Sequence, residues 1–547
     1  MRKGSPNALP DTLFPSIPRR FANGTPLLCP RLRQPCQPAT TLFNCYILAT
    51  IFLTRGTNMT RKTLLALTLS VAPLAWVATS AAKDAGPDAK TAISNATQAL
   101  GAGSLKTLEF TGSGFDYTIG QNYNGTSPWP KFNDKTYTRV IDFDAPASRM
   151  SRVRTQFENP PHGGGQQPVI GDQQQNQIIA AGSPQAAGLK DDLMMSVPSG
   201  FLRAAAAASD ATVKAQKSGG RQYTVISFTG GNKAAVHGYL DAQNMLDKVE
   251  TKIDNNVLGD IDYVTTYSDY KDFAGVKFPT HIVQSQGGYP VLDLTITDVK
   301  PNAPANIVAP QGRGGAPGGG AAPAVTTEKL GDGVWLVLGG YGALVVDMGT
   351  HITLVECPQS DERAAAIIAK AKELVPGKPI TECVNTHSHF DHAGGVRALV
   401  AEGATIVTQE ANKPYYEKIF KNPHTIAPDR LAMNPKKPVF KTVKDHMTIT
   451  GGTHTIELYH QLNYGHHEGM LLVWLPKEKV LVEADGYNPG PRPLAETPAT
   501  ISPYSQNLAD NVARLNLDPQ RIIPIHLPAD NRKITMSELM LAIGKKS

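Results

Sequence analysis

Three histidines and one aspartate lie within six positions of the segment NTHSHFDHAGG at residues 385–395. In an extended chain, residues two apart point to the same side, so His387 and His389 can bind one ion. Asp391 and His392 follow where the chain must turn into a helix, so they can face a neighbouring second ion. Imidazole and carboxylate together suit zinc, whose bonds to nitrogen are about 2.0–2.1 Å long. The pattern predicts a metal centre rather than a polar loop that happens to be rich in histidine.

The residues around this segment alternate between strand-like and helical patterns. The expected strands are 334–338, 343–346, 353–356 and one ending at Asn385, and the expected helices are 361–374 and one near 394–401. Such alternation over roughly 220 residues predicts an α/β domain with its own core. The histidines would then lie at a junction between a strand and a helix.

The HxHxDH arrangement resembles the signature of the metallo-β-lactamase fold superfamily, and the resemblance extends from Glu328 to near the C-terminus. It implies an α/β fold in which two mixed sheets form a sandwich flanked by helices, with the metals at one edge. It also implies that His466, chosen over His467, is the third histidine of the first metal. Asp485 would bridge the metals, and His526 would be the last ligand of the second metal. The predicted ligands are His387, His389, Asp391, His392, His466, Asp485 and His526.

Two positions depart from the pattern of many relatives. Glu356 stands where they carry an aspartate that normally braces the site rather than binding metal, so the change bears on the geometry around the ligands. The bridging position is Asp485 rather than a cysteine, and Gly486 follows it in place of a serine. The second departure argues against antibiotic hydrolysis as the native role.

The expected chemistry follows from two metal ions about 3.5–4 Å apart, which can bridge a water and lower its pKa from about 15.7 towards 7. The resulting hydroxide would attack a carbonyl or another electrophile. Asp391 is the predicted catalytic residue, because it can orient the hydroxide and pass its proton to the leaving group. We therefore expect a dinuclear zinc hydrolase that cleaves an ester, lactone, thioester or amide, with iron or manganese as alternative metals. Tyr464, His467 and Tyr487 are candidates for substrate contact, although a structural role is favoured for each.

Two other classes of function stay open. A periplasmic carrier of lipids or other ligands would use the N-terminal region and keep a metal domain without catalysis. Iron on the same ligands would support an oxidoreductase. The complete set of ligand candidates favours the hydrolase, and the expected partner is a small-molecule substrate. One fold and site of this kind host many reactions, so the sequence does not name the substrate.

Residues 83–300 are predicted to form a mainly antiparallel β domain, because short apolar runs alternate with turn residues. The expected strands are 108–111, 137–143, 223–228, 245–253, 261–267, 276–282 and 291–297. One helix is expected at 200–215, and the Gly-, Gln- and Pro-rich residues 159–188 are expected to form a loop. Residues 301–326 are predicted to be a Gly/Pro-rich linker to the metal domain at 327–547.

The segment 245–300 also resembles repeats of periplasmic lipoprotein-carrier-like half-barrels, which bind acyl chains in a concave sheet. The alternative is a cap or dimerisation domain beside the active site.

Met59 begins a basic stretch that is followed by an apolar run at 64–77 and by small residues up to Ala82, which together describe a secretory signal at 59–82. The apolar run is too short to span a bilayer and contains Pro73, so a cleaved signal is favoured over a membrane anchor. Residues 1–58 form an extension before this signal, and the simplest hypothesis is that translation starts at Met59. The predicted location is the periplasm or the exterior of the cell.

The formal charge of +6 arises in the leader. Residues 1–82 hold nine of the 53 Lys and Arg residues and one of the 47 acidic residues, so residues 83–547 carry a charge of −2. That balance gives no electrostatic case for a nucleic-acid partner. Two of the five cysteines, Cys357 and Cys383, lie after the leader, where they form either one disulfide or two buried thiols.

Overall fold

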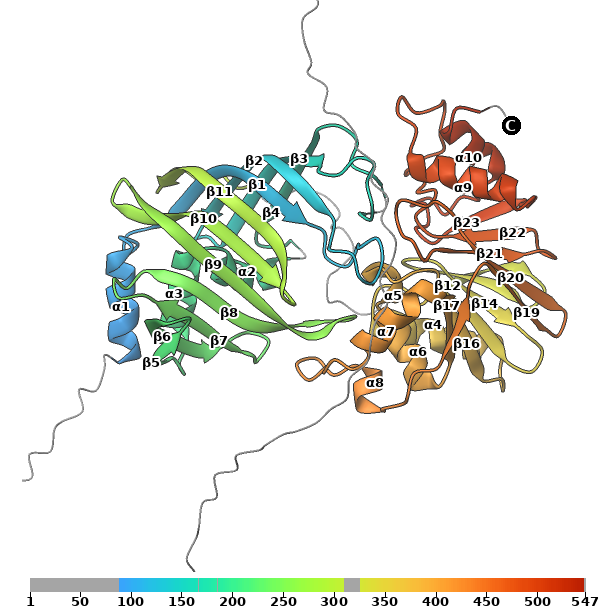
Figure 1. The fold of residues 1–547 in the computed structure, drawn as a ribbon, viewed down its shortest axis with the longest axis horizontal. Helices are drawn as coiled ribbons and strands as arrows, with labels where there is room; N and C mark the ends of the chain where they lie inside the picture. Colours follow the sequence, from blue (N-terminus) through green and yellow to red (C-terminus); the bar gives the residue numbers. More distant parts are fainter. Residues whose placement is uncertain (1–87, 166, 184, 309–324, 546–547) are drawn as a thin grey trace, which may run out of the picture. The chain divides into compact units, whose positions relative to one another are not determined.

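The described residues of the computed structural model are 88–165, 167–183, 185–308 and 325–545, and they form three β-sheets with helices packed on them (Figure 1). The expected extension at 1–58, the expected signal at 59–82 and the centre of the expected linker lie outside these residues. No helix within the described ranges is long and apolar enough to cross a membrane.

The N-terminal region folds into an antiparallel sheet, to which the described residues contribute eleven strands. The order is β4-β3-β2-β1-β11-β10-β9-β8-β7-β6-β5. Strands adjacent in the chain therefore pair, except that β1 pairs with β11 and that β4 and β5 form the two edges. The strands are β1 (Thr107–Tyr117), β2 (Lys131–Asp142), β3 (Ala147–Gln156), β4 (Gln173–Ile179), β5 (Thr212–Ser218), β6 (Arg221–Thr229), β7 (Ala235–Leu240), β8 (Leu246–Asn255), β9 (Gly259–Phe273), β10 (Val276–Gln286) and β11 (Tyr289–Pro301).

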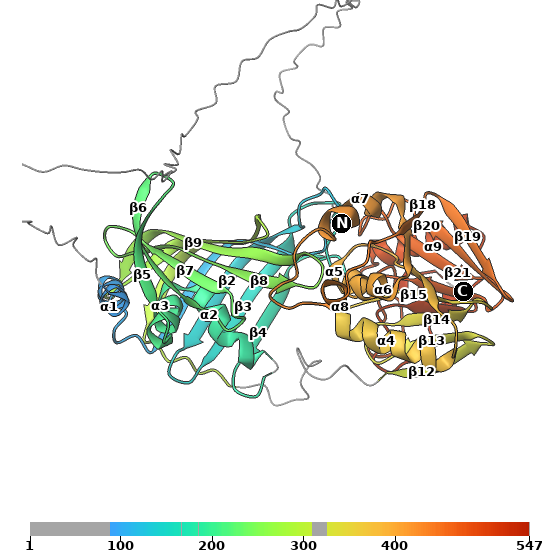
Figure 2. The ribbon, with the colours of Figure 1, turned by 90° about the horizontal axis from the view of Figure 1, so that it is seen from below.

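Helices pack against this sheet and share its hydrophobic core (Figure 2). They are α1 (Ala89–Ala99), α2 (Leu189–Ser196) and α3 (Pro198–Ala207), and a short 3-10 helix (Ala186–Gly188) precedes α2. Phe201 of α3 lies against Phe228 of β6, with ring centroids 5.7 Å apart. The predicted antiparallel β domain is confirmed by this arrangement.

The prediction of one helix at 200–215 is wrong for its second half. Helix α3 ends at Ala207, and Thr212–Ser218 form the edge strand β5, which pairs with β6. The β-branched residues Thr212 and Val213 favour a strand, and pairing with a neighbouring strand outweighs the alanine-rich composition before them.

The prediction of a loop at 159–188 is also wrong in part, because these residues contain strand β4. The glutamines of β4 pair with β3, and Arg152 Nε donates a hydrogen bond of 2.9 Å to Gln175 Oε1. A polar edge strand of this kind is stabilised by its partner strand, and composition alone carries no signal for that partner.

The C-terminal region contains two mixed sheets in the described residues, with orders β12-β13-β14-β15-β16-β17-β18 and β19-β20-β21-β22-β23. Pairing is parallel from β15 to β18 and between β22 and β23, and antiparallel elsewhere. The strands are β12 (Thr326–Gly331), β13 (Val334–Leu338), β14 (Ala343–Asp347), β15 (Ile352–Val355), β16 (Ile380–Val384), β17 (Thr405–Gln409), β18 (Phe440–Val443), β19 (His446–Gly451), β20 (His454–His460), β21 (Leu471–Leu475), β22 (Val480–Glu483) and β23 (Arg521–Pro524).

The two sheets face each other across a core that includes Val346 of β14 and Ile456 of β20. Helices cover the two outer faces: Ile367 of α4 packs on the first sheet, and Leu508 of α9 packs on the second. The helices are α4 (Asp361–Leu374), α5 (Phe390–Ala393), α6 (Val396–Glu402), a 3-10 helix (Glu410–Asn412), α7 (Lys413–Ile419), α8 (Arg430–Met433), α9 (Pro503–Arg514) and α10 (Met536–Ala542). The predicted sandwich of two mixed sheets flanked by helices is confirmed.

The sequence of α4 explains why this helix begins and packs where it does. The Ser360 hydroxyl accepts a hydrogen bond of 3.3 Å from Arg363 N at the first turn, and acidic side chains follow it there. Ala364, Ile367 and Ala371 recur at helical spacing and are fully buried against the sheet.

Cys357 and Cys383 are free thiols in this core, with their Sγ atoms 3.5 Å apart. Burial raises the pKa of the Cys357 thiol well above its usual value. Of the two alternatives for these cysteines, the structure has two buried thiols.

Candidate metal centre

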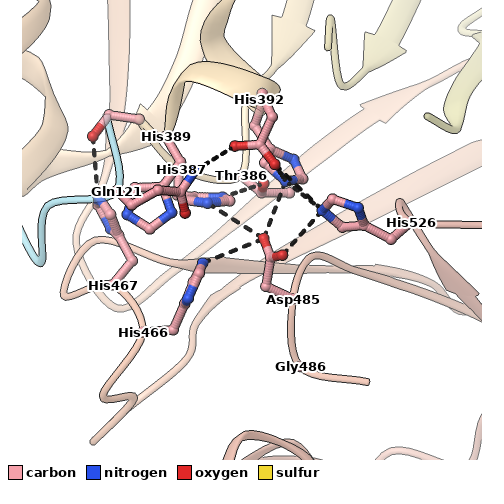
Figure 3. A network of polar contacts seen from close by, with 12 residues as sticks. Gln121, Thr386, His387, His389, His392, His466, His467, Asp485, Gly486 and His526 are labelled. Atoms are coloured by element: carbon pink, nitrogen blue, oxygen red, sulfur yellow. Dashed lines mark hydrogen bonds and ion pairs between the residues drawn. The ribbon is translucent and has the colours of Figure 1, made fainter. Parts of the chain in front are cut away.

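The segment with the HxHxDH pattern leaves strand β16 and enters helix α5. His387, His389 and His392 are completely buried, whereas the side chain of Asp391 is 25% exposed. Buried imidazoles need polar partners, because an unpaired polar group in the core costs free energy. These side chains converge with histidines and an aspartate from later connections of the chain (Figure 3).

A first group consists of His387, His389 and His466, whose nitrogen ligand atoms all lie within 4.8 Å of one another. One nitrogen of His387 and one of His389 are already used: His387 Nδ1 lies 3.1 Å from Thr386 Oγ1, and His389 Nε2 donates to the carbonyl oxygen of Asn122 at 2.9 Å. His387 Nε2, His389 Nδ1 and both nitrogens of His466 are buried and have no hydrogen-bond partner among the described residues. These lone pairs fit a metal ion, since the other ring nitrogens fix the orientation of the first two rings.

A second group consists of Asp391, His392, Asp485 and His526, again with ligand atoms within 4.8 Å of one another. His392 Nε2 and His526 Nε2 lie 3.1 Å apart. Asp391 Oδ2 lies 3.5 Å from each of these two nitrogens. The group joins helix α5 to the chain segments that follow β22 and β23.

Asp485 lies between the two groups, with its backbone in the left-handed region at φ 59°. Its Oδ2 is 3.5 Å from His387 Nε2, 3.4 Å from His466 Nε2 and 3.0 Å from His392 Nε2. Its Oδ1 is 3.0 Å from His526 Nε2. One carboxylate therefore faces nitrogens of both groups.

The spacing of these atoms matches what a metal ion requires. Ligand atoms at about 2.0–2.1 Å from a tetrahedral ion lie about 3.3–3.4 Å from one another. The separations within the second group, and those from Asp485 to His387 and His466, are 3.0 to 3.5 Å and are close to this value. The residues present therefore fit a metal centre.

Glu356 braces the ligand segment, as expected for its position. It is fully buried and lies just after β15, at φ 69°. Its Oε1 accepts a hydrogen bond of 2.6 Å from Thr386 N, and its Oε2 lies 3.0 Å from His392 Nδ1. The second contact directs His392 Nε2 towards the second group.

The pKa values of two histidines favour the neutral form that binds metal. Burial, reinforced by the neighbouring imidazole of His392, holds the pKa of His387 well below its usual value. Burial and the imidazole of His466 do the same for His389.

In the second group, neighbouring charges outweigh burial in setting the pKa values of His392 and Asp485. Burial disfavours a charge on His392, but the carboxylates of Asp391 and Asp485 hold its pKa well above the usual value. Burial likewise opposes ionisation of Asp485, yet the imidazoles of His526 and His466 hold its pKa well below the usual value. A metal ion bound here would displace a proton from His392.

His467 and two tyrosines have structural contacts instead. His467 Nε2 lies 2.9 Å from Ser388 Oγ, and His467 Nδ1 accepts a hydrogen bond of 3.0 Å from Gly469 N, so both ring nitrogens are used. The Tyr487 hydroxyl donates to Glu538 Oε1 at 2.8 Å, and Tyr464 is buried in the core.

Sequence reasoning missed three residues that touch this site. Gln121 Nε2 donates a hydrogen bond of 2.9 Å to Asp391 Oδ1, and Asn122 contributes the carbonyl oxygen described above. The Tyr341 ring lies against His526, with centroids 4.1 Å apart. Gln121 and Asn122 belong to a polar connection between β1 and β2, where nothing in the residue pattern indicated a site.

A cavity of about 320 Å³ reaches the exposed side of Asp391. It is lined by residues 255–257 of the connection between β8 and β9, by Tyr341 and Gln359, and by Phe390 and Asp391. The one ligand with appreciable exposure therefore faces a space that can admit a small molecule.

Comparison with known proteins finds similarity in the C-terminal region. Residues 333–526 match the family model described as the metallo-beta-lactamase superfamily. Similar solved structures include a metallo-beta-lactamase from Pontibacter korlensis, which is 19% identical at a TM-score of 0.31 and is matched over 98% of its length and 40% of this chain. A metallo-beta-lactamase from Hirschia baltica is 22% identical at a TM-score of 0.31, over 99% of its length and 41% of this chain.

Proposed function

Residues 333–526 belong to the metallo-β-lactamase superfamily, and from this premise we propose that the protein is a hydrolase that holds two zinc ions and cleaves an ester, lactone, thioester or amide. The family match and the two groups of ligand atoms support a metal-binding, hydrolase-like enzyme. The proposal goes further by naming zinc as the metal, two as the number of ions and the class of substrate.

The observation that carries the proposal is the position of the Asp485 carboxylate. Its Oδ2 lies 3.5 Å from His387 Nε2 in the first group, and its Oδ1 lies 3.0 Å from His526 Nε2 in the second. A carboxylate between two sets of imidazoles is the arrangement that two adjacent cations need.

Two bound ions would supply an activated water and polarise the carbonyl oxygen of the substrate. Asp391 is the residue to move the proton, because its Oδ2 faces the second group while its side chain borders the cavity. It would accept a proton from the attacking water and deliver it to the leaving group. Glu356 and Thr386 would keep the ligand segment in place during this transfer.

The Asp391→Asn variant tests this proposal on residues 83–547. We expect about two zinc ions per wild-type chain and hydrolysis of at least one lactone, thioester, phosphoester or β-lactam in a panel, with kcat about 10²–10⁴-fold lower in the variant. Asp332→Asn is a matched control, because the Asp332 side chain is 96% exposed on the same domain. Metal analysis distinguishes zinc from iron or manganese. Less than one metal per wild-type chain, or equal activity of Asp391→Asn and wild type, would contradict the proposal.

We also propose that the protein is exported, on the strength of the signal-like residues 59–82. N-terminal sequencing of the natural protein is expected to find a mature chain that begins near Lys83. A mature N-terminus upstream of Met59 would contradict both export by this signal and translation from Met59.

A further inference from the structure

The connection between β1 and β2, residues 118–130, reaches from the N-terminal sheet to the metal ligands. Gln121 Nε2 donates a hydrogen bond of 2.9 Å to Asp391 Oδ1. The carbonyl oxygen of the next residue, Asn122, accepts a hydrogen bond of 2.9 Å from His389 Nε2. One short segment thus touches one ligand of each group.

The two oxygens of Asp391 consequently have different surroundings. Oδ1 accepts the hydrogen bond from Gln121, whereas Oδ2 lies 3.5 Å from both His392 Nε2 and His526 Nε2. A carboxylate can rotate about its last bond, and a fixed donor on one oxygen restricts that rotation. Gln121 therefore directs the other oxygen towards the place of the second ion.

Neighbouring contacts fix the segment on both sides of Gln121. The carbonyl oxygen of Gly120 accepts a hydrogen bond of 3.2 Å from Phe390 N, and the carbonyl oxygen of Tyr123 accepts one of 2.8 Å from Glu468 N. Gly120 has φ +71°, and a Cβ there would lie 2.2 Å from Cγ of the Phe390 ring. The backbone around Gln121 is therefore held against the residue that precedes Asp391.

Gln121 is not among the residues that line the 320 Å³ cavity next to Asp391. A residue that contacts a ligand but not the cavity acts through that ligand rather than on the substrate. We propose that Gln121 is a positioning residue of the metal centre, which holds the Asp391 carboxylate so that one oxygen faces the second ion. This inference rests on the proposed function in taking the ligand set to hold metal, and it assigns part of the centre to the N-terminal sheet.

Zinc binding to metal-free Gln121→Met tests the inference without relying on turnover. The variant keeps the length of the side chain but removes the donor. In a competition titration with a chelator, we expect one of the two zinc equivalents to bind about 10- to 100-fold more weakly than in wild type, while the other is unchanged. In the metal-loaded enzyme, kcat should fall while KM stays the same, because the cavity lining is intact.

Pro128→Ala is the matched control on the same segment. Pro128 is exposed, so its replacement leaves the contacts of Gln121, Asn122 and Asn124 in place. We expect both zinc equivalents to bind this control as in wild type.

Two outcomes would overturn the inference: wild-type affinity for both zinc equivalents in Gln121→Met, or equal weakening of zinc binding in Gln121→Met and Pro128→Ala. If Gln121→Met does not fold, as judged by thermal unfolding, Gln121→Ala must give the expected selective loss. Failure of the proposed function would appear separately, as a wild-type protein that binds two ions but hydrolyses nothing in the panel.

Discussion

Buried carboxylates of the N-terminal sheet are paired with arginines, whereas Asp485 in the C-terminal region is surrounded by histidines. Arg154 donates to both oxygens of Asp116, at 2.9 and 2.7 Å, and Arg152 lies 3.2 Å from Asp116 and 3.5 Å from Asp134. The Arg154 guanidinium also stacks on a phenylalanine ring at 3.6 Å. In this cluster the charges of the side chains already compensate one another.

Around Asp485, the ion pairs formed by described residues involve histidines alone. Imidazoles compensate a carboxylate only when protonated. The pKa of His387 lies well below its usual value, whereas the pKa of His392 is held well above it, so these neighbours do not compensate Asp485 equally. Several nitrogens of the first group also lack a hydrogen-bond partner within the part of the chain that is described. The N-terminal carboxylates thus face guanidinium groups that are cationic at neutral pH, whereas Asp485 faces imidazoles whose charge depends on protonation, and a metal ion fits among them.

The largest expected effect comes from Asp485→Asn. Loss of the carboxylate that faces both groups should weaken the binding of both metal ions. We expect kcat to fall by about 10³-fold or more, since metals supply several kcal/mol of transition-state stabilisation. Metal content and kcat measure this effect. A variant that retains two ions and full activity would contradict a role of Asp485 in metal binding, and the two clusters would then not differ in this respect.

Arg154→Met should act on stability instead of on metal binding. The Asp116 carboxylate would lose its bidentate partner in a buried position, which costs about 3–5 kcal/mol of unfolding free energy. Urea unfolding measures this loss, and the number of zinc ions at saturation should stay at the wild-type value. If the variant lost metal without losing stability, the N-terminal cluster would not be the self-contained pair described above.

Glu356→Gln should give an intermediate effect. The amide keeps the shape but weakens the contacts with Thr386 N and His392 Nδ1, so we expect metal affinity about 10- to 100-fold lower. Chelator competition provides the measurement. Glu382→Gln is the control, because Glu382 is on β16 of the same sheet but pairs with Lys441 at the surface. Equal metal affinities of Glu356→Gln and the control would show that Glu356 does not support the metal ligands.

The smallest expected effect is on the pH dependence of stability in the N-terminal cluster. Burial raises the pKa of Asp134 to about 6, although the charge of Arg152 acts in the opposite direction. The folded state then holds this proton more tightly than the unfolded state, whose pKa is about 3.8, so stability falls as the pH rises from about 4 to 6. Asp134→Asn should flatten this decline in urea unfolding of the metal-free protein. An unchanged slope would show that Asp134 titrates normally.

The sequence was most informative where the site is local. His387 and His389 are two residues apart in an extended segment, and the structure places both in the first group, with Asp391 and His392 in the second. The later ligands are far away along the chain, and only the resemblance to a known family could connect them to this segment.

Other parts of the site had no such signal. Gln121 contacts a residue 270 positions later, and its own neighbours have the composition of an ordinary loop. The polar strand β4 was missed for the same reason: its stability depends on pairing with β3, which is not encoded in the composition of β4 itself. Long-range contacts of polar residues are therefore what residue patterns alone left out.

Gly120 ties the evolution of the two halves of the protein together. A side chain at position 120 would overlap the Phe390 ring, so the packing of Phe390 in one half restricts which residue the other half can carry there. A recombination event that exchanged either half for that of a distant relative would bring together a loop and a helix that never adapted to each other. The two halves should therefore be inherited as a pair, and a change at Phe390 should be accompanied by a change at position 120.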